Sequence, residues 1–211
     1  MRSYPKEKVQ EMMTSDEWTR AIFVREPKER TLSAFLNKFA DPKNNHYFRR
    51  HCCSMLHMSP AHRKECKVKQ EAADFGYFLE RTLDCENPHW TLQSERVDDK
   101  WWPYITFIGY MHTVGSNSKD LLESIRSVKD NVTAWEKFGK SGWGDDSEQG
   151  FMQIPSTYHP TNAREKMRKY YTICDEAFVE TQLAKDWLSS YLNFDEVHLY
   201  DQNETGEFMC A

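Results

Sequence analysis

The sequence has no long apolar run. Nowhere among its 211 residues do about eighteen apolar side chains follow one another, the minimum for a membrane-spanning helix. The first twenty residues, MRSYPKEKVQEMMTSDEWTR, also contain no apolar centre of the kind found in secretory signal peptides. We therefore expect membrane contact only through an anchor that the given sequence does not contain.

The sequence also lacks an excess of positive charge. The 28 Lys and Arg residues are outnumbered by 33 Asp and Glu residues, which gives a formal net charge of -5 at pH 7. Nucleic-acid-binding domains are normally basic, so no nucleic-acid partner is expected. The G-x4-G-K-[ST] loop of many ATPases and kinases is missing as well, which makes a nucleotide kinase a remote alternative.

What is present indicates strands alternating with helices. The apolar run AIFV at 21–24 is typical of a buried parallel strand, and Pro27 suits the first turn of a helix. After Pro27, apolar side chains repeat at i, i+3, i+4 and i+7, namely Leu32, Phe35, Leu36 and Phe39. A second strand is predicted at 104–108, closed by Gly109. The expected class is α/β, with one domain over residues 1–211.

Further segments are predicted from periodicity and capping residues. The expected helices are 5–19, 69–83, 117–128, 161–171 and 174–192. Two segments are expected to be irregular, a Cys/His-rich loop insertion at 40–68 and a flexible Gly-rich loop at 139–160.

The stretch from Phe23 to Phe39, FVREPKERTLSAFLNKF, carries the first functional signal. Arg25 follows a strand, at the edge where open α/β sheets bind ligands. The helix after it offers backbone N–H groups and a positive dipole end to a phosphate, and Arg25 offers a bidentate fork. Ser33 adds a hydroxyl about two turns into that helix. On the residues alone, the more ordinary interpretation is that Arg25 and Ser33 are solvated surface side chains.

This stretch resembles the 3′-phosphate-binding motif of the Golgi carbohydrate sulfotransferases, the family of the chondroitin and HNK-1 sulfotransferases. Its pattern is F-V-R-[DE]-P-x-E-R-x-x-S-A-[FY]-x-N-K-F. Four later segments resemble the family's motifs in the same order, NPHW at 87–90, YITFIGYMHT at 104–113, HPTNAREKMRKYY at 159–171 and FVETQLAKDW at 178–187. In the second of them, His112 stands where an acidic residue is common in the family.

The resemblance implies a P-loop-like sulfotransferase fold, a small parallel sheet flanked by helices. It also implies transfer of a sulfuryl group from 3′-phosphoadenosine 5′-phosphosulfate to a hydroxyl of a glycan or polysaccharide acceptor, without a metal. Arg25 and Ser33 would bind the 3′-phosphate of the donor, and Arg30 would support them or pair with Glu26.

Four more site residues follow from the later motifs. Lys166 and Arg164 would reach anionic groups of donor or acceptor, or else remain solvated helix residues. His89 is the candidate catalytic base, because imidazole titrates near neutral pH; the alternative is a structural histidine. Trp90 beside it is the candidate for stacking on the acceptor sugar.

One family element has no counterpart in the sequence. The family's Lys-x-Gly/Ala-x-Thr/Ser loop, which holds the 5′-phosphosulfate, should precede the 3′-phosphate motif, and the residues before Ala21 do not spell it. We therefore expect a fold that is incomplete at the N-terminus, truncated from a type II membrane protein of the Golgi lumen. The alternative is a catalytically inactive sulfotransferase-like protein that binds carbohydrate or acts as a scaffold.

The cysteines allow two interpretations. Cys52, Cys53, Cys66 and Cys85 fit disulfides of an oxidising compartment, where the sequons at Asn131 and Asn203 would carry glycans. Together with neighbouring histidines the first three could instead bind zinc, although their spacing matches no standard zinc motif.

Overall fold

The computed structural model describes most of the chain. The described residues are 4–53, 59–125, 132–136 and 161–189, with Leu192 and Leu199. The loop predicted at 139–160 lies outside them. Within the predicted domain, two compact units are distinguished. The sheet unit comprises Met1–Arg25 and Glu95–His159, and the helical unit comprises Glu26–Ser94 and Pro160–Ala211.

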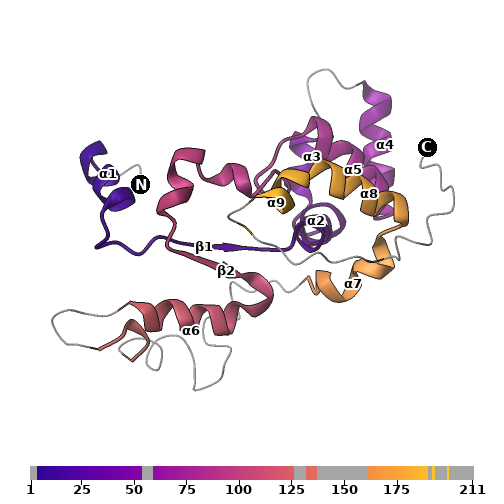
Figure 1. The fold of residues 1–211 in the computed structure, drawn as a ribbon. Coiled ribbons are helices and arrows are strands. Elements are labelled where there is room, and N and C mark those ends of the chain that lie inside the picture. The colour runs from indigo at the N-terminus through magenta and orange to yellow at the C-terminus, as the bar shows by residue number, and fades with distance from the viewer. Residues whose placement is uncertain are drawn as a thin grey trace. The chain divides into compact units, whose positions relative to one another are not determined.

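The sheet unit is built on two parallel strands, β1 (Ala21–Val24) and β2 (Phe107–Tyr110), drawn side by side in Figure 1. Ala21 pairs with Phe107 and Phe23 with Gly109. The other main elements in the described part of this unit are helices. They are α1 (Lys6–Thr14), η3 (Asp99–Tyr104), η4 (Met111–Thr113) and α6 (Val114–Ser124), with α6 packed on β2.

Gly109 lies inside β2 rather than closing the strand. A Cβ atom at this position would come within 2.4 Å of the Phe23 ring across the pair, so only glycine leaves the ring its place. The strand also starts later than predicted, because the residues up to Tyr104 form the 3-10 helix η3 with Pro103 inside it.

Helix α6 begins three residues earlier than the predicted start at Asn117. Asn117 is not its cap; the side-chain Oδ1 accepts hydrogen bonds from the backbone N–H of Tyr110, at 2.7 Å, and from the Thr113 hydroxyl, at 3.0 Å. These bonds fold the end of β2 back onto the first turn of α6. Helix α1, in turn, ends at Thr14 and not at residue 19.

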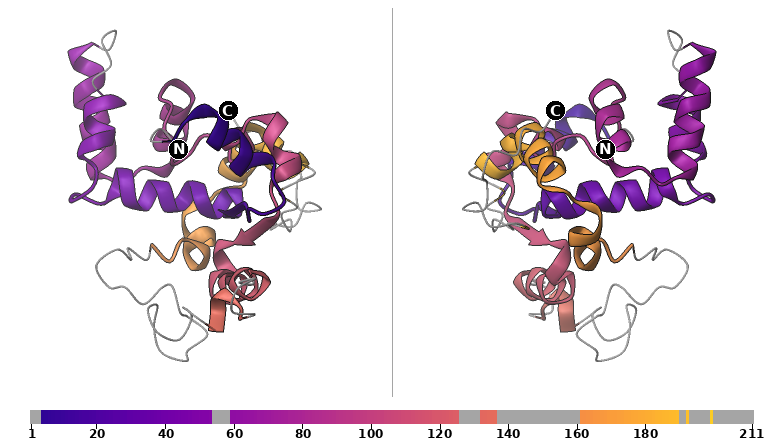
Figure 2. Two further views of the ribbon diagram at one scale, coloured as in Figure 1. Left: turned by 90° about the vertical axis from the view of Figure 1, so that its left-hand side faces the viewer. Right: turned by 90° about the vertical axis from the view of Figure 1, so that its right-hand side faces the viewer.

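The helical unit begins with a single rod. α2 (Pro27–Ala34) continues without interruption into the π-helix η1 (Phe35–Ala40), as Figure 2 shows. The other helices are α3 (His46–His51), α4 (Pro60–Glu71), α5 (Phe75–Asp84), α7 (Ala163–Tyr170), α8 (Ile173–Gln182) and α9 (Ala184–Leu188), and η2 (Ser94–Arg96) lies where the units meet in sequence.

Aromatic rings make the centre of this unit. Phe35 and Phe39 on the rod are fully buried and meet Phe78 of α5, with ring centroids 5.5 and 5.6 Å apart. Phe48 of α3 packs edge-on against Phe39 at 4.9 Å. The apolar stripe predicted after Pro27 is therefore confirmed as a core face, and burial of such rings is the main stabilising contribution.

The predicted loop insertion at 40–68 is wrong in its structure, because α3 and most of α4 lie in this range. Disulfides Cys52–Cys85 and Cys53–Cys66 join these helices to the core. The expected disulfides among these four cysteines are confirmed. Since the sulfurs are bonded to one another, the zinc alternative is wrong.

Two predicted long helices are each divided in two. Between α4 and α5, Ala73 has a positive φ of 49° and the Asp74 side chain caps α5 by accepting from the Tyr77 N–H at 2.9 Å. α8 starts at a capping box of Thr172 and Asp175, and gives way at Leu183 to α9. The class is as predicted: a mostly helical α/β fold with a small parallel sheet.

Among the described residues, every helix is too short or too polar to cross a membrane.

Candidate anion-binding site

The N-terminus of α2 is occupied by the protein itself. The buried carboxylate of Glu26 accepts hydrogen bonds from the backbone N–H groups of Lys28, at 3.1 Å, and Glu29, at 2.6 Å. Burial raises the pKa of Glu26 even though these bonds oppose the shift. The expectation that this helix end offers its N–H groups to a phosphate is therefore wrong.

Lys28 fixes the same helix end to α8. Its side chain is 2% exposed, and its Nζ lies 2.5 Å from Glu176 Oε1 and 2.9 Å from Glu180 Oε1. Burial alone would lower the pKa of Lys28, but the two carboxylates outweigh it and raise the pKa. The Tyr171 hydroxyl completes the arrangement by donating to the Lys28 carbonyl at 2.8 Å.

Ser33 lies near the C-terminal end of α2, against the start of α7. Its Oγ is 2.9 Å from Thr161 Oγ1, and the Lys166 Nζ donates to the Thr161 carbonyl at 2.8 Å. Asn162, between them, has a left-handed backbone with φ 49°, and its side chain makes no capping hydrogen bond to α7. Two hydroxyls, an ammonium group and a helix start thus lie together, an arrangement suited to an oxyanion.

Two further predicted cations belong to the same two segments of sequence, Arg25 before Ser33 and Arg164 between Thr161 and Lys166. Arg164 is exposed in the first turn of α7, where the helix dipole is positive. Arg25 directly follows β1 as predicted and is the last residue of the sheet unit.

Arg30 has a positioning role. Its guanidinium donates to the carbonyl of Thr91 at 2.6 Å and to that of Pro88 at 2.8 Å, which fastens the 87–91 segment to α2. The exposed His89 is carried by that segment, and its backbone N–H donates to the buried Asn87 Oδ1 at 2.9 Å.

Asp186 holds the far end of the same segment. Its carboxylate is completely buried and accepts from the backbone N–H of Gln93 at 3.0 Å and of Ser94 at 2.8 Å. The Ser94 hydroxyl donates to it as well, at 2.8 Å. The candidate base His89 therefore lies on a segment, residues 87–94, that is held by hydrogen bonds from Arg30 and to Asp186. We call this segment the strap.

The role predicted for Trp90 needs correction. The side chain is 5% exposed, its Nε1 donates to the Cys85 carbonyl at 2.7 Å, and its ring lies 5.9 Å from Phe48 and 5.5 Å from Phe78. A ring enclosed in this way has no face for a sugar. Trp90 is a core residue that anchors the strap beside His89.

Sequence reasoning missed two residues of this arrangement. Thr161 lies in the HPTNAREKMRKYY stretch, but its contact with Ser33 joins positions 128 residues apart. Asp186 lies in the FVETQLAKDW stretch, where no pattern indicates a role for it. Only the fold shows that its carboxylate meets Gln93 and Ser94.

The sheet unit has a cavity of its own, of about 470 Å³. Side chains of α1, β1 and η3 line it, and Trp18 and Trp101 contribute half-buried aromatic surface. Arg20 is held there by hydrogen bonds from its guanidinium to the carbonyls of Ser15, at 2.6 Å, and Tyr104.

The helical unit therefore brings two hydroxyls, an ammonium group and a helix start together, a combination suited to a phosphate or sulfate group. The chain matches the Sulfotransferase family model over residues 1–195 and belongs to that family. Sulfuryl transfer is accordingly its class of chemistry. No curated protein and no solved structure matches it.

Proposed function

We propose that the protein is a carbohydrate O-sulfotransferase that uses 3′-phosphoadenosine 5′-phosphosulfate as donor. Within the family, the observation that carries the proposal is the contact of Ser33 with Thr161 and of Thr161 with Lys166. Ser33 belongs to the stretch that resembles the donor-binding motif, and its neighbours supply the hydroxyl and the charge that a phosphate dianion requires.

The hydroxyls of Ser33 and Thr161 and the ammonium group of Lys166 hold the 3′-phosphate of the donor. Arg25 is assigned to the same phosphate by the resemblance, and Arg164 adds positive charge at the start of α7. These groups are already oriented, Ser33 and Thr161 by the hydrogen bond between their hydroxyls and Lys166 by its hydrogen bond to the Thr161 carbonyl.

In the transfer, the acceptor hydroxyl oxygen forms a bond to sulfur as the bond from sulfur to the 5′-phosphate oxygen breaks. The electron pair of that bond leaves with 3′-phosphoadenosine 5′-phosphate, and His89 takes the proton of the hydroxyl. Sulfuryl transfer resembles phosphoryl transfer in its loose transition state, so alignment matters most. The strap held by Arg30 and Asp186 supports His89 in that role.

Donor binding tests the proposal directly. We expect 3′-phosphoadenosine 5′-phosphate to raise the melting temperature, and Ser33→Ala to weaken its binding about tenfold, as for a lost hydrogen bond to a charged group. Ser124→Ala, which removes an exposed hydroxyl of α6, is the matched control and should bind normally. Equal affinity of the two variants, or no binding to the unchanged protein, would contradict the proposal.

The glycan acceptor and the compartment belong to the same proposal. The resemblance supports a polysaccharide acceptor and a type II membrane glycoprotein of the Golgi, and the disulfides of the helical unit suit an oxidising lumen. Transfer of labelled sulfate to desulfated chondroitin, but not to a simple phenol, is the expected outcome.

The second candidate is a non-catalytic carbohydrate-binding protein of the same fold. The cavity of the sheet unit favours it, since Trp18 and Trp101 offer aromatic surface of the kind on which sugars stack. It predicts glycan binding that Trp101→Ala weakens, without any stabilisation by 3′-phosphoadenosine 5′-phosphate.

A further inference from the structure

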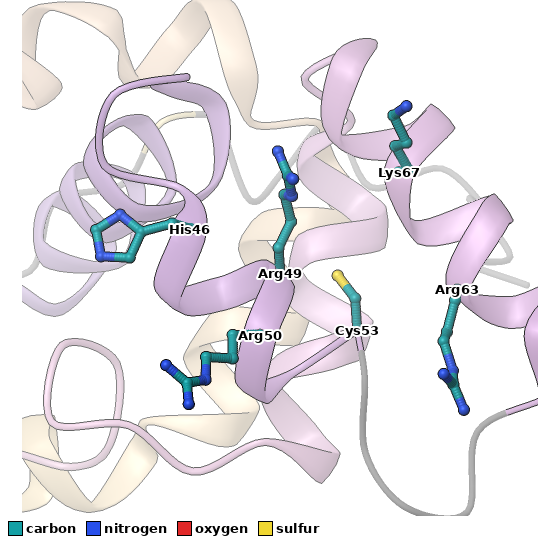
Figure 3. A pocket seen from close by; sticks show the side chains of 6 residues that line it. All are labelled: His46, Arg49, Arg50, Cys53, Arg63 and Lys67. Carbon is teal, nitrogen blue, oxygen red and sulfur yellow. The ribbon is translucent and has the colours of Figure 1, made fainter.

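A cavity of about 320 Å³ in the helical unit is lined by basic side chains. Figure 3 shows it between α3 and α4. Among the described residues that line it, none is acidic. They are His46, Arg49, Arg50, Cys53, Arg63 and Lys67. Four permanent positive charges therefore surround one hollow of a protein whose net charge is -5.

The helices place these cations together by their periodicity. On α3, His46, Arg49 and Arg50 are spaced i, i+3 and i+4, which puts them on one side of the helix, while Phe48 points into the core. On α4, Arg63 and Lys67 are spaced i, i+4 and are exposed. The buried partner on that helix is Cys66.

A covalent bond keeps the two helices facing each other. Cys53, the second residue after α3, is bonded to Cys66 of α4, and in Figure 3 it lies between Arg50 and Arg63. Like charges held at this spacing repel one another, which costs stability unless an anion offsets it. Lys67 lies 3.8 Å from Glu71 of the same helix, but both side chains are 67% exposed, so this ion pair contributes little to stability.

The side chains spread along the cavity and do not converge on one point (Figure 3). A single small anion would reach only some of them, whereas a chain with repeated negative groups would reach all. We propose that this cavity binds a sulfated polysaccharide, so that an already modified stretch of the polymer is retained while another sugar reacts. The choice of polymer rests on the proposed function; the cavity and its charge do not.

Binding of a chondroitin sulfate oligosaccharide, measured by calorimetry without donor, tests this inference. Arg50→Gln with Lys67→Gln should weaken binding about tenfold and make it less sensitive to salt. The matched control is Lys100→Gln with Lys119→Gln, two exposed lysines of the sheet unit, which should change affinity less than twofold. Because all four side chains are exposed, both double variants should keep the melting temperature of the unchanged protein.

The opposing outcomes are distinct. Equal binding by the two double variants, or no binding by the unchanged protein, would overturn the inference. So would tighter binding of a single-stranded oligonucleotide or of anionic lipid vesicles, since either would identify a different partner. Stabilisation by 3′-phosphoadenosine 5′-phosphate is measured separately. If it fails while cavity-dependent polysaccharide binding persists, the proposed function is wrong and this site stands.

Discussion

At the scale of single residues, the most consequential side chain is a lysine with no direct part in the proposed chemistry. Lys28 carries a charge into the core, where Glu176 and Glu180 stabilise its ammonium group by accepting hydrogen bonds from it. Sequence patterns cannot reveal this pair, since 148 residues separate Lys28 from Glu176. A lysine in the first turn of a helix is ordinarily solvated.

Removing that lysine should be costly. Lys28→Met leaves Glu176 buried without its counter-charge, and we expect a loss of about 3–5 kcal/mol in the free energy of unfolding. Chemical denaturation measures it. Glu176→Gln in the same chain removes the stranded charge and keeps an acceptor, so the double variant should recover part of the loss. A double variant that is as unstable as the sum of both single changes would show that the pair is not coupled.

Glu26 gives stability a dependence on pH. Burial raises its pKa in the folded state above the ordinary value of 4.5, so the folded protein binds this proton more readily than the unfolded chain. The contribution of Glu26 to stability therefore falls as pH rises from about 4.5 through the folded-state pKa. We expect Glu26→Gln to remove that decline, measured as the difference between the two unfolding free energies from pH 4.5 to 7. A constant difference over this range would refute the assignment.

At the scale of elements, the sequence predicted secondary structure well where apolar periodicity or the residues at a helix start determine it. The parallel strand at 21–24, the helix start at Pro27 and the stripe of Leu32, Phe35 and Phe39 were predicted correctly. The predicted burial of that strand is wrong, because only Val24 of its four residues is buried. Helix ends were less predictable. Ala73 separates two helices through its positive φ, and Asn117 accepts a hydrogen bond from Tyr110 of β2 and is not a helix cap. The same holds for the candidate site: a sequence motif predicted Ser33, but only the folded structure shows that Thr161 is its partner.

The two disulfides should differ in what they contribute. Cys52–Cys85 closes a separation of 33 residues and Cys53–Cys66 one of 13, so the loop-entropy model gives each about 3 kcal/mol and the first somewhat more. Replacing both members by serine, one pair at a time, should show this order in denaturant unfolding. The reverse order would mean that packing around Cys66 outweighs chain entropy.

The attachment of the strap that carries His89 can be tested by removing the side chain of Arg30, which holds it. Arg30→Met removes two hydrogen bonds to its backbone and should cost about 2–4 kcal/mol, as expected for bonds from a charged group. Transfer should slow while affinity for 3′-phosphoadenosine 5′-phosphate stays unchanged, because Ser33, Thr161 and Lys166 do not depend on the strap. Lost donor affinity in a folded Arg30→Met protein would assign Arg30 to the phosphate instead.

At the scale of the whole molecule, the covalent links are unevenly distributed. Among the described residues, the disulfides Cys52–Cys85 and Cys53–Cys66 lie in the helical unit, and Cys174 of that unit is disulfide-bonded as well. The sheet unit is held instead by strand pairing, by the packing of α6 on β2 and by hydrogen bonds such as those of Arg20. Reducing conditions should therefore act on one unit and spare the other.

Hydrogen exchange with and without a thiol reductant tests this division. We expect amides of α3, α4 and α5 to lose protection on reduction, while those of β1 and β2 keep theirs, because breaking the disulfides enlarges the conformational freedom of the helical unit alone. Stabilisation by 3′-phosphoadenosine 5′-phosphate should weaken in parallel, since Ser33, Thr161 and Lys166 belong to that unit. Simultaneous loss of protection in β1 and β2 would instead show that the two units unfold as one cooperative body, and would make redox state a control on the entire fold.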